Sequence, residues 1–139
     1  MRAKPMAPLE DKGANMAGQQ IDFASLAWDG WNSETLARVK MAEADGYELR
    51  LFELGPGFVE PNWCTRGHVG LVVSGQYVTD LDGGTLQMRA GQGFVLPPGT
   101  RHRSRNTGAM PAIVFLVDLD APALAAAQPA AKGQAKGAK

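Results

Sequence analysis

The chain has 139 residues, which is enough for one domain built around a single hydrophobic core. Its 14 basic residues balance its 14 acidic residues, so net charge gives no reason to expect a nucleic-acid or anionic-membrane partner. One cysteine cannot form an internal disulfide, and no segment approaches the roughly 20 apolar residues of a membrane span. The N-terminal stretch also lacks the apolar core of a signal peptide, so we expect a cytoplasmic protein.

The two ends of the chain differ in composition from the middle. Residues 121–139 are rich in Ala, Lys and Gly and contain no aromatic or β-branched residue. Such a segment cannot bury enough apolar surface to offset its ordering entropy. We therefore expect a flexible N-terminal segment at residues 1–18, one folded domain at residues 19–120 and a disordered tail at residues 121–139. Weak binding of the basic tail to an acidic partner is the alternative.

The middle of the chain predicts strands almost throughout. A short helix is expected only near residues 23–28. Residues 35–41 and 47–54 then alternate apolar and polar side chains with the period of two that a half-buried strand requires. Further strands are predicted at residues 67–75, 76–81, 85–90, 93–98 and 112–119. Many short strands separated by Gly and Pro indicate an all-β sandwich or barrel.

One hairpin has a specific turn signal. Asp82 is followed by Gly83 and Gly84, and Asp-Gly pairs tolerate the positive φ angles of two-residue hairpin turns. The sequence therefore predicts that the strands on either side of this turn pair with each other.

The stretch from residue 91 to residue 106 carries the most specific pattern of the chain. Its residues fit the pattern G-x5-P-x-G-x2-H-x3-N, whose five fixed positions are Gly91, Pro97, Gly99, His102 and Asn106. This stretch closely resembles the second motif of the cupin superfamily. The resemblance implies a single-domain cupin-type double-stranded β-helix, a jelly-roll barrel, with flexible termini. Pro97 and Gly99 are expected to form a sharp turn, after which His102 opens a strand and faces inward.

An altered first cupin motif precedes it. The family pattern is G-x5-H-x-H-x3,4-E-x6-G, and Gly75 fills its last position. Counting back places His68 at the glutamate, Cys64 at the second histidine and Asn62 at the first. The only cysteine and both histidines of the chain thus fall at positions where cupins keep metal ligands.

The resemblance therefore implies a metal site made by Cys64, His68 and His102. A thiolate and two imidazoles suit a borderline divalent ion, with zinc favoured and iron, nickel or copper as alternatives. Three protein ligands leave a coordination position open, as in catalytic rather than structural sites. A metal-free barrel, in which the cysteine is a buried hydrophobe and the histidines are hydrogen-bonded, is the bland alternative.

Several neighbouring residues are candidates for further roles. Arg66 is a candidate clamp for a substrate carboxylate or a loop residue that points to solvent. Asn62 is a weak ligand, a group that supports the ligands, or a turn residue. Either Gln76 or Tyr77 lines the barrel, and Gln76 is therefore a candidate substrate-binding residue. Glu60 is a candidate for proton transfer if it faces the cavity.

Two further features also have competing readings. The alternating arginines Arg101, Arg103 and Arg105 indicate a solvated strand face paired with acidic neighbours, or a site for an anion or RNA. Trp63 either walls the cavity or packs outside the barrel.

The expected function is that of a metal-binding cupin acting on a small polar molecule inside the barrel. The metal would serve as Lewis acid or as activator of water or O₂, in an isomerase, lyase or dioxygenase. The alternative is a non-enzymatic cupin that binds or senses a small ligand or metal. We expect a homodimer that makes contact through residues 21–31, and neither a nucleic-acid nor a membrane partner.

Overall fold

The computed structural model describes residues 18–30 and 34–119. These residues contain eight strands and one short 3-10 helix. In chain order these are η1 (Phe23–Ser25), β1 (Ala37–Ala44), β2 (Tyr47–Leu54), β3 (His68–Ser74), β4 (Gln76–Leu81), β5 (Gly84–Arg89), β6 (Gly93–Leu96), β7 (His102–Arg105) and β8 (Ala112–Asp118). The ends expected to be flexible and disordered, residues 1–18 and 121–139, lie outside the described residues apart from Gly18.

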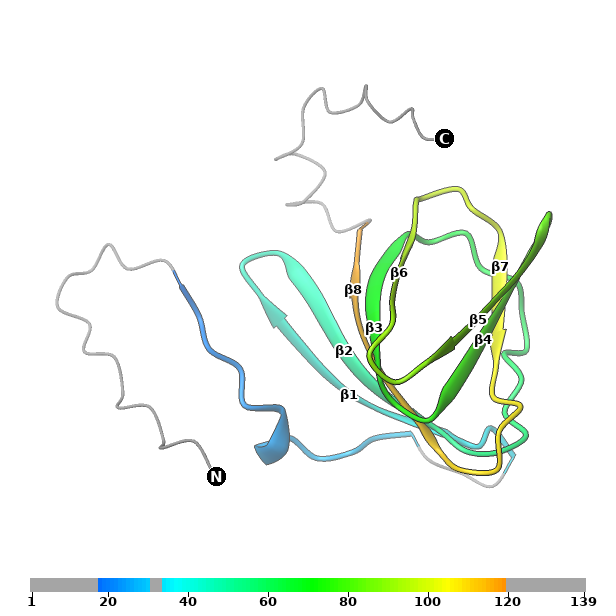
Figure 1. The fold of residues 1–139 in the computed structure, drawn as a ribbon. Coiled ribbons are helices and arrows are strands. Elements are labelled where there is room, and N and C mark those ends of the chain that lie inside the picture. Colours follow the sequence, from blue (N-terminus) through cyan, green and yellow to red (C-terminus); the bar gives the residue numbers. More distant parts are fainter. Residues whose placement is uncertain (1–17, 31–33, 120–139) are drawn as a thin grey trace, which may run out of the picture.

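The strands form two antiparallel sheets that face each other. The larger sheet has the order β1-β2-β8-β3-β6, and the smaller has the order β5-β4-β7. Figure 1 shows β4, β5 and β7 of the small sheet on the right, with β8, β3 and β6 of the large sheet to their left. This arrangement confirms the all-β jelly-roll barrel that the sequence predicts.

Two tight hairpins have Asp-Gly turns. Leu81 pairs with Gly84 across the predicted turn between β4 and β5. A second hairpin joins β1 and β2, where Ala44 pairs with Tyr47. Its turn residues Asp45 and Gly46 have φ angles of 56° and 86°, as the favoured two-residue turn demands. The strand expected at residues 35–41 therefore begins two residues too early and ends three residues too early, because Leu36 has a positive φ of 57° and the chain turns only at Asp45.

Strand β3 has one buried face and one exposed face. His68 and Val72 are buried, with exposed fractions of 9% and 0%. Val69, Leu71 and Val73 point outward and are 40–48% exposed.

Gly75, which follows β3, allows the chain to turn into the other sheet. Its φ is +81°, and an added Cβ would lie 2.4 Å from the carbonyl oxygen of Pro111. Only glycine fits this position without displacing the backbone.

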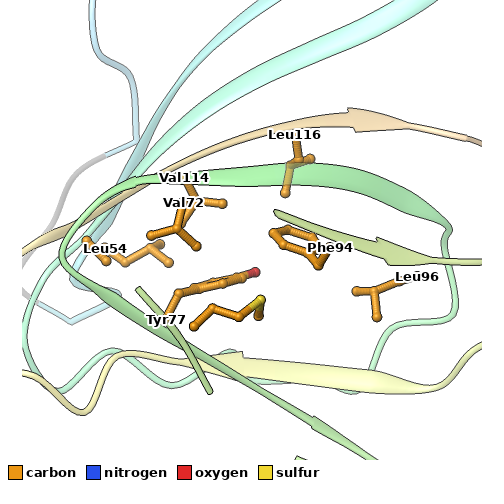
Figure 2. Packing of buried hydrophobic residues seen from close by; sticks show 9 residues of the cluster. Leu54, Val72, Tyr77, Phe94, Leu96, Val114 and Leu116 are labelled. Carbon is orange, nitrogen blue, oxygen red and sulfur yellow. The ribbon is translucent and has the colours of Figure 1, made fainter. Parts of the chain in front are cut away.

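The hydrophobic core joins the two sheets. Its buried members are Leu54, Val72, Tyr77, Met88, Phe94, Leu96, Ala112, Val114 and Leu116. Figure 2 shows Tyr77 of the small sheet lying across from Val72 and Val114 of the large sheet, with Phe94 beside it. The Tyr77 and Phe94 ring centroids are 5.7 Å apart.

The segment before β1 packs on the outer face of the large sheet. The expected helix at residues 23–28 is the single 3-10 turn η1. The Phe23 ring packs edge-on against Phe115 of β8, with centroids 5.8 Å apart, and Lys40 Nζ donates to the Phe23 carbonyl at 2.8 Å. The expected dimer contact at residues 21–31 stays a prediction, and its last residue, Trp31, lies outside the described residues. Within the described ranges, no helix has the length and apolar character needed to span a bilayer.

Candidate metal centre

Cys64, His68 and His102 converge at one end of the barrel. One ligand atom of each side chain lies within 4.8 Å of the other two. Both histidines are buried, with exposed fractions of 9% and 2%, and their ring centroids are 5.2 Å apart. The three residues implied by the motif resemblance therefore share one location, although they come from a loop and two strands in different sheets.

Backbone pairing places Cys64 beside His102. The Cys64 N–H donates to the His102 carbonyl at 2.8 Å, and the His102 N–H donates back at 2.9 Å. The two residues thus form an isolated antiparallel bridge between the loop and β7. The Arg66 N–H donates to Cys64 Sγ at 3.4 Å.

A fully buried carboxylate orients His68. The Asp118 Oδ1 atom lies 2.9 Å from His68 Nδ1, and the Asp118 side chain has no exposed surface. Because Asp118 is paired with two guanidinium groups, it is the acceptor and His68 Nδ1 carries the proton. Nε2 is then left with its lone pair free, which is the arrangement of a histidine ligand supported by a carboxylate. Burial lowers the pKa of His68, although Asp118 acts in the opposite direction, and a neutral imidazole is the form that binds a metal.

His102 is oriented in the same way by a backbone group. Its Nδ1 lies 2.9 Å from the carbonyl oxygen of Thr100. A carbonyl oxygen can only accept, so Nδ1 is the donor and Nε2 is again the free nitrogen.

Asp118 also connects the centre to a group of charged side chains. Its Oδ2 atom accepts from Arg50 at 3.1 Å and from Arg66. Both guanidinium groups also contact Glu48, at 3.2 Å and 3.4 Å. Two arginines and two carboxylates thus neutralise one another behind His68.

A second carboxyl group lies beside the ligands on the opposite wall. Glu60 Oε1 accepts from the Ser104 N–H at 2.9 Å. Burial raises the pKa of Glu60, while this hydrogen bond and His102 act in the opposite direction. The Ser104 hydroxyl accepts from Tyr77 at 2.9 Å and lies 3.1 Å from Thr79 Oγ1.

These groups line a cavity of about 280 Å³. Its lining residues are Ala37, Arg50, Phe52, Leu54, Phe58, Glu60, Cys64, Arg66, His68, Tyr77, His102, Ser104, Val114 and Leu116. A cavity with mainly apolar walls and a few convergent polar groups is the usual form of a small-molecule site.

The predicted substrate-binding residues lie in different places. Arg66 lines the cavity, with its side chain 45% exposed and its guanidinium bound to Asp118. Asn62 is exposed and is not among the cavity-lining residues. Gln76 is exposed and lines shallow surface pockets with Gly108 and Thr107, whereas its neighbour Tyr77 lines the cavity. The substrate-binding roles of these three residues stay predictions.

The arginine stripe and Trp63 form the outer face of β7. Arg101 donates to Asp82 at 3.1 Å, and Arg105 contacts Asp80 at 2.7 Å and 3.0 Å. The Arg101 guanidinium carbon lies 4.2 Å from the centre of the Trp63 ring. The expected pairing with acidic neighbours is confirmed for Arg101 and Arg105, whereas Arg103 lies over the Trp63 ring. Trp63 is not among the cavity-lining residues.

Sequence reasoning missed Asp118 and Arg50. Both lie in alternating strands, where a charged residue reads as solvent-facing or as the end of an apolar run. Only the pairing of His68 with Asp118, between β3 and β8, brings this carboxylate to the histidine. The direction of Glu60 was likewise open until its contact with Ser104 placed it in the cavity.

Known proteins resemble this chain in sequence and in fold. A family model described as Cupin domain matches residues 50–118. The polyketide cyclase RemF from Streptomyces resistomycificus is similar in structure, with TM-score 0.61 and 16% identity, over 73% of this chain and 78% of that chain. KdgF from Halomonas sp. has TM-score 0.60 and 19% identity, over 73% of this chain and 93% of that chain.

A curated protein also matches a short part of the sequence. Polyketide synthase CurC from Streptomyces cyaneus is 51% identical over 37 residues, which are 27% of this chain and 24% of that protein. The matched region thus spans about a quarter of that relative's length. The family match runs from Arg50 in β2 to Asp118 at the end of β8, and the chain belongs to the cupin superfamily.

Proposed function

We propose that this cupin binds one divalent metal ion through Cys64, His68 and His102 and uses it on a small molecule held in the barrel cavity. Zinc is favoured over iron, nickel and copper, because one thiolate and two imidazoles form a borderline-soft ligand set. The observation that carries the proposal is the convergence of the three ligand atoms within 4.8 Å, with both histidine Nδ1 atoms already engaged elsewhere.

The fit to zinc is chemical as well as spatial. Tetrahedral ligands at the usual zinc distances lie about 3.3–3.8 Å from one another. The three candidate ligand atoms lie within 4.8 Å of one another, which is a somewhat wider limit than the spacing around a bound zinc ion. Cys64 lies outside the strands and is therefore the ligand best able to move toward the other two. Because the three residues would fill three of four positions, a substrate atom could take the fourth.

A divalent ion held there supplies a Lewis acid for a substrate oxygen. Within the chain, Glu60 is the side chain suited to carry a proton. It faces the same cavity, and burial raises its pKa. No histidine remains for this task, since the two in the sequence are assigned to the metal.

Arg66 lies at the mouth of the cavity and could meet an anionic group of the substrate. Its guanidinium is shared with Asp118 and Glu48, so only its remaining N–H groups are available. Neither Asn62 nor Gln76 lines the cavity, and their substrate-binding roles stay predictions.

We place the chain among metal-dependent enzymes of small molecules, with isomerase, lyase and dioxygenase chemistry as candidates. The presence of a carboxyl group with a raised pKa, Glu60, in the same cavity favours this over a sensing or storage cupin. The likeness to RemF adds ring-forming chemistry to the candidates, as a proposal drawn from that protein's described activity.

Metal content and turnover test the proposal together. We expect about one equivalent of zinc per wild-type chain after loading and dialysis, and loss of that stoichiometric zinc in Cys64→Ser, His68→Ala and His102→Ala. Thr65→Ala is the matched control, because Thr65 is the exposed neighbour of Cys64 and should keep its metal. Retention of metal by all three ligand variants would contradict the proposal.

Turnover then separates enzyme from binder. Zinc-loaded and chelator-stripped protein are compared on a panel of small carboxylic acids and keto compounds. Metal-dependent conversion that is lost in Glu60→Gln supports the enzyme. Stoichiometric binding of a panel member without conversion supports the binding protein instead.

A further inference from the structure

The cavity is polar at one end and apolar at the other. On the large sheet, register fixes the order of the inward-facing side chains. His68 pairs with Asp118 at the metal end, and the next inward pair is Leu116 with Arg50. In the next inward-facing pair along β2 and β8, Phe52 with Val114, both side chains are apolar.

The last row on this wall continues the trend. Leu54 pairs with Ala112 of β8 and with Ala37 of β1. Inward-facing residues follow one another at about 6.7 Å along a strand, so this row lies about 13 Å beyond the Arg50 row. Phe52, Leu54 and Ala37 all line the cavity, so the hollow extends along this wall.

The opposite wall has the same gradient. The loop before β3 runs beside β7, with Cys64 bonded to His102 and Glu60 bonded to Ser104. Two residues further from the metal end, the Asn106 N–H donates to the carbonyl oxygen of Phe58.

Asn106 fixes the direction of this second wall. Its side chain donates to the Leu54 carbonyl at 2.9 Å, so the Phe58 end of the loop meets the Leu54 end of the large sheet. On both walls the metal ligands therefore come first. One row with a charged side chain follows, Arg50 on the large sheet and Glu60 on the loop, and apolar side chains come last.

Resting on the proposed function, we propose that the cavity takes an amphiphilic ligand: an oxygen-bearing, metal-binding head joined to an apolar ring-bearing body. The head belongs at Cys64, His68 and His102. The body lies against Phe52, Leu54 and Phe58 and the Val114 side chain.

The alternative of a ligand that is polar all round, such as a free sugar, conflicts with these walls. Hydroxyl groups set against Phe52, Val114 and Leu54 would lose water without gaining a partner, which is costly. The hydroxyl of Tyr77, which also lines the cavity, already donates to Ser104. The proposal therefore assigns the polar character expected of the small molecule to the head.

Charge at the metal end suits an anionic head. Arg50 and Arg66 are balanced by Glu48 and Asp118, so this group adds no net charge. A divalent ion with one thiolate ligand leaves one positive charge, which a carboxylate, hydroxamate or enolate would neutralise.

Two hydroxamic acids with the same head test the inference. Acetohydroxamate carries a methyl group and benzohydroxamate a phenyl ring. Titration calorimetry gives the two dissociation constants for zinc-loaded and for chelator-stripped protein, with the affinities for free zinc as reference. After that correction, we expect benzohydroxamate to bind the zinc-loaded protein at least about tenfold more tightly, because its ring is buried by apolar walls.

Variants locate the effect. Phe52→Ala should reduce the preference for the phenyl compound about fivefold or more while zinc stoichiometry stays at one, since Phe52 does not touch the ligands. Val95→Ala is the control, because Val95 is 61% exposed and does not line the cavity. If Phe52→Ala does not fold, NMR saturation transfer from the methyl groups of Val114 and Leu54 to the bound phenyl ring replaces it.

The two proposals fail in different ways. If the protein takes up no zinc, the metal site is wrong, and the stripped protein still tests the walls by its preference for the phenyl compound. A corrected preference within about twofold of unity in both forms would overturn the amphiphilic ligand. So would a preference that is unchanged in Phe52→Ala, or the absence of saturation transfer where that measurement replaces it.

Discussion

Replacing Asp118 with asparagine should weaken metal binding without altering any ligand. Asp118 Oδ1 is 2.9 Å from His68 Nδ1, and the carboxylate is fully buried. An asparagine side chain has nearly the same shape as the aspartate it replaces, so the change removes mainly the negative charge. Without that charge, His68 is held less firmly with Nδ1 protonated and Nε2 free, which is the state that binds a metal.

Two magnitudes follow from the contacts of Asp118. Loss of a carboxylate behind a ligating histidine typically costs 10–100-fold in metal affinity, or about 1.4–2.7 kcal/mol. The variant also removes the charge of one of the two carboxylates that Arg50 and Arg66 share, and only Glu48 remains as a charged partner. Breaking a fully enclosed ion pair costs about 3–5 kcal/mol, and we expect about 2–3 kcal/mol here because both guanidinium groups reach solvent.

Asp80→Asn is the matched control for this variant. Asp80 also holds an arginine, with Arg105 at 2.7 Å and 3.0 Å, but this pair lies on the outer face of the small sheet. Zinc affinity is measured by competition with a chromophoric chelator, and stability by urea unfolding of the metal-free proteins. Asp80→Asn should keep wild-type zinc affinity. A zinc affinity of Asp118→Asn within about threefold of wild type would refute the role given to this carboxylate.

Three further predictions concern stability. Burial raises the pKa of Glu60, so the folded chain holds this proton to higher pH than the unfolded chain and loses stability as pH rises above the ordinary value of 4.5. Glu60→Gln lacks that loss, so urea unfolding should show its stability relative to wild type increasing from about pH 4 to about pH 7; a constant difference would contradict this. Val72→Ala should lower the free energy of unfolding by about 2 kcal/mol, because Val72 has no exposed surface, whereas exposed Val95→Ala should lower it by under about 0.5 kcal/mol. Equal losses in the two variants would contradict the burial of Val72 in the core. Gly75→Ala should lower the thermal midpoint strongly through its clash with a backbone carbonyl, and Gly83→Ala, which meets nothing within 4 Å, should not; similar midpoints would show that the β3–β4 corner is not as described.

The sequence was sufficient for features that depend on local pattern. Residues 47–54 alternate cleanly and form β2 with the predicted bounds. The inward placement of His102 followed from the resemblance of its motif. The first hairpin could also have been found, because Asp45-Gly46 is the same turn signal as the one that was used.

Features that depend on strand pairing were beyond the sequence. Asp118 lies 50 residues from His68 and reaches it only because β8 pairs with β3. No local pattern distinguishes Tyr77 from Gln76 as the residue that lines the cavity, since the turn at Gly75 sets the phase of β4. The change from a polar to an apolar end of the cavity is likewise visible only in the structure, because it depends on which residues of the strands and the loop lie next to one another.

X-ray absorption at the zinc edge tests the central claim most directly, because it reports the atoms around the ion. For the zinc-loaded protein, the site made by Cys64, His68 and His102 predicts one sulfur at about 2.3 Å and two imidazole nitrogens at about 2.0 Å. The sulfur should disappear in Cys64→Ser. A shell of oxygen and nitrogen alone in the wild-type protein, or a protein that takes up no zinc, would contradict the account.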